Sequence, residues 1–145
     1  LVEDLPEDRF VTAFFGLLDA STHTVRFHSA GQGPIMHFHA ADRSYDWHEP
    51  STFPLGYMAQ SELGPGVSLR LEPGDILGLI SDGIYEYENE VGLQFGQKGV
   101  RSVIDAMPGG KAEELVPAIM HAARMHGGSA PQADDITIVL VRRNF

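Results

Sequence analysis

The stretch at residues 75–81 constrains the fold more than any other, because it is apolar at the positions that face both sides of a strand. A strand with two apolar faces fits burial between two layers of structure. The stretch ends abruptly at Asp82-Gly83, and a carboxylate at the end of a buried strand costs free energy unless its charge is compensated. We therefore expect a layered core with an acidic group at its edge that needs a partner.

A β-hairpin is predicted upstream of this strand. Residues 10–21 are apolar and rich in residues that favour strands, and residues 23–31 alternate between two faces. The residues between them have a turn composition, so the hairpin should close near residues 19–23. One face of the second strand would carry Val25, Phe27 and Ser29, and the other would carry Thr24, Arg26 and His28.

The remaining elements are short strands followed by two helices. A Pro-Gly-rich loop is expected at residues 50–66, a turn at Pro73-Gly74 and an acidic, irregular segment at residues 83–95. The other predicted strands are residues 34–40, 43–49, 67–71 and 136–144, and the predicted helices are residues 95–107 and 111–128. Strands that precede helices are typical of an α+β fold with an antiparallel sheet covered by helices, and we expect residues 1–145 to form one domain.

The second helix has the clearer pattern. Acidic residues in its first turn and Gly127-Gly128 at its end fit a helix start and stop. Pro117 is tolerable only near the first turn and should kink the helix if it lies deeper. The apolar positions at helical spacing are Ala112, Leu115, Val116, Ile119, Met120 and Ala123.

Composition excludes several classes of function. A net charge of −10 argues against a nucleic-acid groove and against docking on anionic lipid, because both need clustered basic residues. The absence of cysteine excludes disulfides, thiolate zinc sites and a cysteine nucleophile, and it is compatible with a cytoplasmic protein. No apolar run approaches the roughly 20 residues of a membrane span. The N-terminus lacks an initiator Met and a signal-peptide pattern, so the chain looks cut from a longer protein.

Two acidic sites share one design. Asp82 closes a predicted buried strand, and Asp134-Asp135 precedes another after a loop that contains Pro131. If the two strands are antiparallel neighbours, these carboxylates converge at one sheet edge, where they repel unless a cation neutralises them. Carboxylate oxygens suit Mg²⁺ or Mn²⁺. The alternative is that Asp82 is a turn residue and that Asp134-Asp135 caps a loop.

Several stretches, in this order, resemble the C-terminal part of the SpoIIE/RsbU-type phosphatases, a bacterial branch of the metal-dependent serine/threonine protein phosphatases (PPM family). The stretches are FVTAFFGLLDASTHTVRFHSAGQGP, FPLGY, LEPGDILGLISDGIYE, FGQKGV and PQADDITIVLVRR. The resemblance implies an antiparallel β-sandwich flanked by helices, here without its N-terminal strands and helix. It also implies a two-metal Mn²⁺ or Mg²⁺ centre whose bridging water attacks a phosphoserine or phosphothreonine.

By position, the resemblance makes Asp82 and Asp134 metal ligands. It gives Asp135 a role in supporting these ligands or the local structure, and it implies that Gly83 lets the backbone approach the metal site. No catalytic residue beyond the metal site is implied. The family's other ligands lie in upstream acidic motifs that this chain lacks, so the fragment alone is expected to be inactive. The parent would end a multidomain signalling regulator, after a receiver or sensor domain, and would act on a phosphorylated anti-sigma-factor antagonist.

Other interpretations stay open. A catalytically degenerate domain of this fold could serve as a protein-binding adaptor, and a purely structural β-rich domain would use its acids only as turn residues. Edge strands could pair with another copy and form a homodimer. His37 and His39 share a strand face and could bind zinc together with His28, although a solvated strand face is the favoured interpretation.

Overall fold

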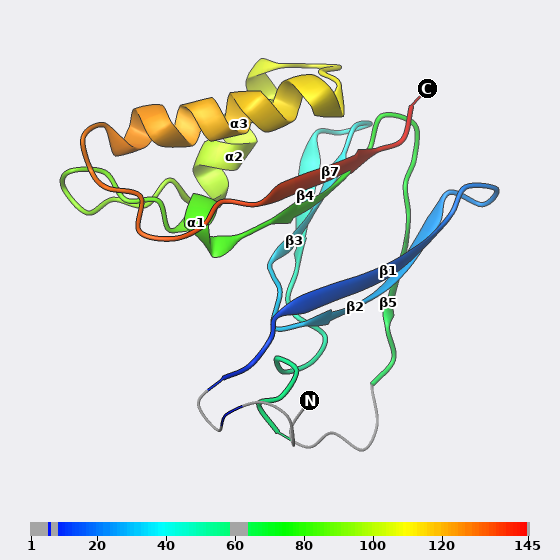
Figure 1. Ribbon diagram of the computed structural model, residues 1–145. Coiled ribbons are helices and arrows are strands. Elements are labelled where there is room, and N and C mark those ends of the chain that lie inside the picture. Colours follow the sequence, from blue (N-terminus) through cyan, green and yellow to red (C-terminus); the bar gives the residue numbers. More distant parts are fainter. Residues whose placement is uncertain (1–5, 7–8, 59–63, 145) are drawn as a thin grey trace.

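Strand β6 (Ile76–Ile80) lies at the centre of the fold, and four of its five residues are buried. Ile76 and Ile80 pack towards the helices, whereas Leu77 packs towards a second sheet. The prediction of a strand buried between two layers is therefore confirmed. The computed structural model describes residues 6, 9–58 and 64–144 (Figure 1).

Two antiparallel sheets make up the β-structure of the described residues. The larger has the strand order β4-β3-β6-β7 and the smaller the order β1-β2-β5. The other strands are β1 (Ala13–Asp19), β2 (Thr24–Ala30), β3 (Ile35–His39), β4 (Ser44–His48), β5 (Val67–Arg70) and β7 (Ile138–Arg142). The three layers are visible in Figure 1, where α2 and α3 cover the outer face of the larger sheet and the smaller sheet lies on its other side.

The predicted hairpin is confirmed. Strands β1 and β2 pair antiparallel from Ala13 opposite Ala30 to Asp19 opposite Thr24. Val25, Phe27 and Ser29 are all buried on the inner face of β2, as the alternation predicts. The alternating pattern thus fixes which face of this sheet packs on the other.

The Pro73-Gly74 turn separates two strands that belong to different sheets. Strand β5 pairs with β2, whereas β6 pairs with β3 and β7. Gly74 has φ of +91°, a conformation that glycine adopts without steric cost. The Gly74 N–H donates to the carbonyl oxygen of Arg143 at 2.9 Å, so this turn between the two sheets is hydrogen-bonded to the end of β7.

Two of the three helices match the predicted segments. Helix α2 (Gly96–Ala106) and helix α3 (Ala112–Gly127) lie within the expected ranges, and Leu115, Ile119 and Ala123 of α3 are buried. Pro117 lies inside α3 beyond its first turn, at an exposed position. The segment expected to be irregular from residue 83 instead begins with a single helical turn, α1 (Asp82–Tyr85).

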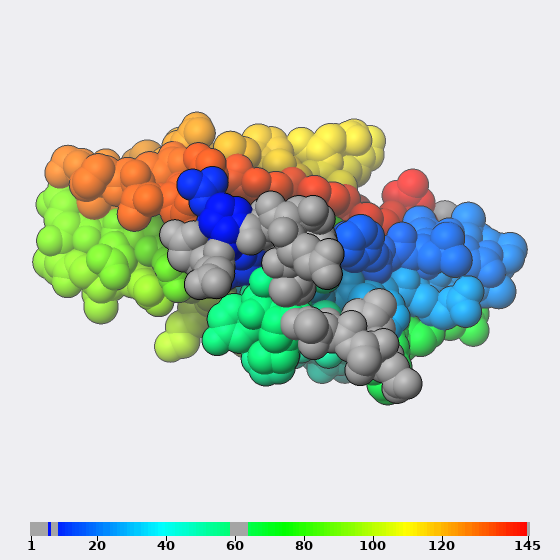
Figure 2. All heavy atoms as spheres, turned by 60° about the horizontal axis from the view of Figure 1, so that its bottom comes forward, coloured from blue at the N-terminus to red at the C-terminus, as the bar shows by residue number. Residues whose placement is uncertain are grey.

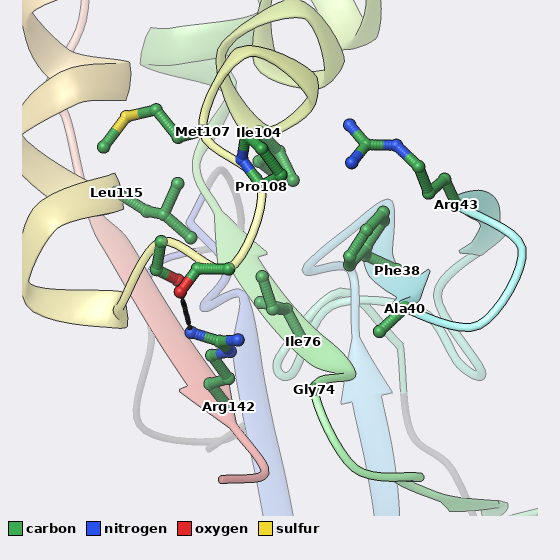
Figure 3. Close-up of a pocket in the computed structure, with 12 residues that line it drawn as sticks. Phe38, Ala40, Arg43, Gly74, Ile76, Ile104, Met107, Pro108, Leu115 and Arg142 are labelled. Carbon is green, nitrogen blue, oxygen red and sulfur yellow. Dashed lines mark hydrogen bonds between the residues drawn. The ribbon is translucent and has the colours of Figure 1, made fainter. Parts of the chain in front are cut away.

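The α2–α3 connection is anchored to the end of β7. Arg142 donates from Nη1 to the carbonyl oxygens of Gly109 and Gly110, at 2.7 and 2.6 Å (Figure 3). Beside this contact a cavity of about 190 Å³ is lined largely by apolar side chains, among them Phe38, Ile104 and Leu115. None of the helices in the described part of the chain is long and apolar enough to cross a membrane.

Candidate metal centre

The acidic edge, defined here by residues 81–83 and 134–137, forms where β6 ends and β7 begins. The two strands are antiparallel neighbours, with Ile80 opposite Ile138. The chain therefore leaves β6 towards Asp82 beside the segment that carries Asp134 into β7. The sequence analysis assumed that these two strands are antiparallel neighbours, and the structure confirms this pairing.

Ser81 joins the two segments through three hydrogen bonds. Its N–H donates to the carbonyl oxygen of Thr137 at 3.0 Å, and its hydroxyl donates to the carbonyl oxygen of Asp135 at 3.1 Å. The N–H of Thr137 donates in return to the Ser81 hydroxyl at 2.9 Å. Sequence reasoning missed this role, because a serine that follows a buried strand gives no signal of a partner more than fifty positions away.

Gly83 lies directly against the second segment. A Cβ atom added at Gly83 would collide with the carbonyl oxygen of Asp135 and would lie 3.2 Å from that of Asp134. Gly83 therefore lets its backbone lie close to these two residues, and its approach to a metal site stays a prediction. Any larger residue at this position must push the two segments apart.

The carboxylates themselves are exposed. Asp82, Asp134 and Asp135 all lie at the surface, so the expectation of a buried acid at the end of β6 is wrong. The physical reason is that the chain leaves the buried layer at Ser81, one residue before the acid. The Asp134 carboxylate accepts a hydrogen bond from the N–H of Asp135 at 2.7 Å, which holds it next to its own backbone.

The charge of Asp82 affects the pKa of a buried neighbour, Tyr85. Burial, and then the Asp82 carboxylate, raise the pKa of Tyr85, which is 7% exposed on the inner side of α1. The phenol therefore stays neutral, and its hydroxyl donates a long hydrogen bond of 3.5 Å to the carbonyl oxygen of Pro34. Helix α1 is thus fixed by its buried side while it presents Asp82 to solvent.

A cleft of about 630 Å³ opens beside the acidic edge between residues 83–94 and 130–134. In Figure 2 the yellow-green and orange segments that carry these residues lie side by side at one end of the molecule. Glu86, Glu88, Glu90 and Asp134 line the cleft. Hydrogen bonds from Ser129 lower the pKa of Glu90 and tie the acidic segment to the end of α3.

The edge provides a fitting but incomplete donor set. Two exposed carboxylates on adjoining segments offer the oxygen ligands that Mg²⁺ and Mn²⁺ prefer. Within the described residues, Asp82 and Asp134 do not belong to any cluster of three or more metal-ligating side chains. A full coordination shell for two ions therefore needs further ligands beyond those that these residues supply.

The histidines are placed differently from the expectation. His37 and His39 do share a face of β3, but His37 is only 4% exposed, so the interpretation as a solvated face is wrong. The reason is that this face is turned towards the smaller sheet. His28 lies on the outer face of β2, whereas Val25 and Phe27 lie on its inner face, so His28 is not part of this cluster. The third side chain beside His37 and His39 is Asp46.

Comparison with known proteins identifies the fold of this chain and the family to which it belongs. Two antiparallel sheets flanked by helices match the fold of PP2C-type phosphatase domains. The SiaA PP2C domain of Pseudomonas aeruginosa superposes with a TM-score of 0.73 at 20% identity, over 91% of this chain and 51% of that one. A SpoIIE structure from Bacillus subtilis, with the PP2C phosphatase domain and a regulatory fragment, has a TM-score of 0.77 at 19% identity, over 97% and 40%.

The sequence matches the family described as stage II sporulation protein E (SpoIIE) over residues 1–144, and the chain belongs to this family. It is 27% identical over 135 residues to protein IcfG of Synechocystis sp. strain PCC 6803, which covers 93% of this chain and 21% of IcfG. The chain thus spans about half or less of the relatives described here. The resemblance and the sandwich fold inferred from the sequence are both confirmed.

Proposed function

We propose that this chain forms part of a metal-dependent phosphoserine/phosphothreonine protein phosphatase, with Asp82 and Asp134 as ligands of Mn²⁺ or Mg²⁺. The observation that carries the proposal is the antiparallel pairing of β6 with β7, which sets the two acidic segments side by side. Membership of the SpoIIE family supports it. Solved relatives include a manganese-soaked SpoIIE phosphatase domain and RsbX in complex with magnesium.

Each residue of the acidic edge has a distinct part in the proposed site. Asp82 and Asp134 supply anionic oxygens, and their mutual repulsion is relieved when a cation binds. Ser81 and Gly83 hold the two backbones together, and Asp135 supports Asp134 through its N–H. When bound, the metal ions supply an activated water and neutralise charge on the phosphoryl group.

The remaining ligands and the regulation are assigned to the longer parent protein. We propose that upstream acidic motifs complete the centre, that the 145-residue chain alone is inactive and forms a single domain, and that a receiver or sensor domain precedes it. The proposed substrate is a phosphorylated anti-sigma-factor antagonist in the cytoplasm. These assignments rest on the family resemblance.

The test is an assay of phosphoserine-protein hydrolysis by the parent, extended upstream to the length of a full phosphatase domain. We expect turnover that requires Mn²⁺ or Mg²⁺ and that Asp82→Asn or Asp134→Asn lowers at least a hundredfold. Glu113→Gln is the matched control, because this exposed acid lies in the first turn of the 16-residue helix α3, whereas the segment that carries Asp134 follows the other end of that helix. It should leave the rate unchanged.

Two results would contradict the proposal. A folded parent that hydrolyses no phosphoserine protein with either metal would favour the adaptor interpretation. The next experiment would then be the capture of proteins that bind the domain. Full activity of the Asp82→Asn protein would remove Asp82 from the metal site even if the phosphatase activity itself is real.

A further inference from the structure

We infer a second metal site, separate from the acidic edge, formed by His37, His39 and Asp46 on the β3–β4 hairpin and suited to Zn²⁺. Each of the three offers one ligand atom, and these atoms lie within 4.8 Å of one another. In a tetrahedral zinc site with bonds of about 2.0–2.1 Å, the ligand atoms are separated by about 3.4 Å. Small side-chain movements therefore bring this cluster to zinc-binding geometry.

Strand register sets these side chains on one face. His37 lies directly opposite Asp46 in the β3–β4 pairing, and His39 is two residues further along the same face. Met36 and Phe38, which alternate with them, pack in the helix-covered core instead. The rings of His37 and His39 are 4.0 Å apart between centroids, and Nε2 of His39 is 2.9 Å from Oδ2 of Asp46.

A buried carboxylate orients the imidazoles. Asp75 is 2% exposed, and its Oδ2 is 3.3 Å from Nε2 of His37 and 3.9 Å from Nδ1 of His39. Its two oxygens are fixed by the backbone N–H groups of Ala40 and Glu72, at 2.8 and 2.9 Å. Metal-binding histidines usually donate their other ring N–H to such a carboxylate. Asp75 therefore provides the support that a histidine ligand needs.

An unsatisfied histidine lies beside the cluster. His48 lies on the same sheet face, and its ring centroid is 6.4 Å from that of His37. Its Nε2 is buried and has no hydrogen-bond partner among the described residues. A buried polar atom without a partner is uncommon and points to a missing ligand or water. This observation is independent of the three-residue cluster and concerns a ring that stacks beside His37.

The chemistry of the cluster selects the kind of metal. Two imidazoles and a carboxylate suit Zn²⁺, whereas Mg²⁺ and Ca²⁺ prefer all-oxygen sites. The His39 and Asp46 side chains are 31% and 64% exposed, so an ion can enter from solvent. A bound ion would fasten the β3–β4 hairpin to the start of β6 through Asp75.

The alternative is a metal-free arrangement, in which His39–Asp46 is a surface ion pair and His37–Asp75 a structural hydrogen bond. The two interpretations differ in a direct measurement. The metal-free 145-residue chain is titrated with Zn²⁺ by calorimetry, and Co²⁺ is added separately to record the visible absorption of a tetrahedral site. We expect one ion per chain, and we expect His39→Gln and Asp46→Asn each to weaken binding at least tenfold.

Two variants serve as controls. His28→Gln removes a histidine from the outer face of β2 and should leave Zn²⁺ binding unchanged. Asp82→Asn tests whether the ion is bound at the acidic edge, and it should also have no effect. Asp46 is mostly exposed, so Asp46→Asn keeps the test valid even if the histidine variants unfold. Far-UV circular dichroism verifies the fold of each variant.

Three results would overturn the inference. These are an absence of Zn²⁺ binding by the folded chain, equal affinity in the Asp46→Asn protein, and loss of binding in Asp82→Asn. None of the readouts depends on phosphatase activity, so the zinc site and the proposed function can fail independently of each other.

Discussion

The two sheets of this protein are built from similar strands but differ in how they are covered. The sheet β4-β3-β6-β7 packs helices on one face and the second sheet on the other, and β6 is buried almost throughout. The sheet β1-β2-β5 packs on one face only. Phe15 and Leu17 of β1 are 62% and 61% exposed. On the inner face of the same strand, Phe14 packs against the cluster that includes Ile35 of β3 and Leu77 of β6.

This difference in coverage predicts how much each sheet contributes to the free energy of unfolding. Apolar side chains contribute to stability in proportion to the area that folding removes from water, at about 25 cal/mol per Å². The helix-covered sheet should therefore supply most of the free energy of unfolding, whereas the outer face of β1 should supply little. The residues of both proposed metal sites lie in the helix-covered sheet or in the segments that directly adjoin its strands.

The largest expected effect is in the helix-covered core. Ile119 of α3 is fully buried, so Ile119→Ala removes buried methyl groups and leaves a cavity. We expect a loss of about 2–5 kcal/mol in the free energy of unfolding, measured by urea denaturation. Ile119→Val is the matched control and should cost only about 0.5–1.5 kcal/mol. A loss below 0.5 kcal/mol for the alanine variant would show that α3 does not stabilise this sheet.

The next effect is at the acidic edge. Gly83→Ala places a methyl group against the carbonyl oxygen of Asp135, and we expect it to cost about 1–3 kcal/mol by overpacking. It should also impair metal-dependent activity of the parent, because Asp82 and Asp134 are displaced from each other. Gly64→Ala is the control, since a Cβ there has no neighbour within 4 Å. Equal stability of the two variants would show that the segments separate without cost.

A much smaller effect is expected on the outer face of β1. Leu17→Ser should change the free energy of unfolding by no more than about 0.5 kcal/mol, as is usual for exposed positions. Phe27→Ala on the inner face of β2 provides the contrast and should be clearly destabilising, because it leaves a cavity in a buried position. If Leu17→Ser is strongly destabilising, this face is covered in solution and the comparison between the sheets no longer holds.

The smallest effect is confined to the β1–β2 turn. Hydrogen bonds from the hydroxyl and the N–H of Ser21, and from Thr22, lower the pKa of Asp19 from 3.8 to about 2. Because the folded pKa is depressed, the stabilisation is present above pH 3.8 and is lost as the pH falls through about 2. An NMR titration of the Asp19 carboxyl should give a midpoint near pH 2. A midpoint near 3.8 would mean that the turn is open.

Much of the fold follows from local patterns in the sequence. Alternation in residues 24–30 predicted the inner face of β2, and the apolar run before Asp82 predicted a strand between two layers. The proximity of the Asp82 and Asp134 segments followed from one assumption about strand pairing, which the structure satisfies. These features depend on periodicity and on the two ends of strands, which a sequence displays directly.

Other features could not be predicted, because they depend on contacts between distant parts of the chain. The sequence does not show which face of β3 meets the second sheet, so the burial of His37 was missed. Asp46 and Asp75 reach the histidines from another strand and from the Pro73-Gly74 turn. The exposure of Asp82 was also missed, since it depends on the chain turning outward one residue earlier, at Ser81.

The pairing of β6 with β7 has a consequence for the order of folding. Both long helices lie between these strands in the chain, so the contact that brings Asp134 to Asp82 spans a long loop and is slow to form. During synthesis Asp82 leaves the ribosome well before Asp134, because the chain is made from its N-terminal end. A chain interrupted between α3 and β7 would thus keep most of its core residues and yet lack half of the acidic edge, because the Asp82 and Asp134 segments meet only once β7 has paired with β6.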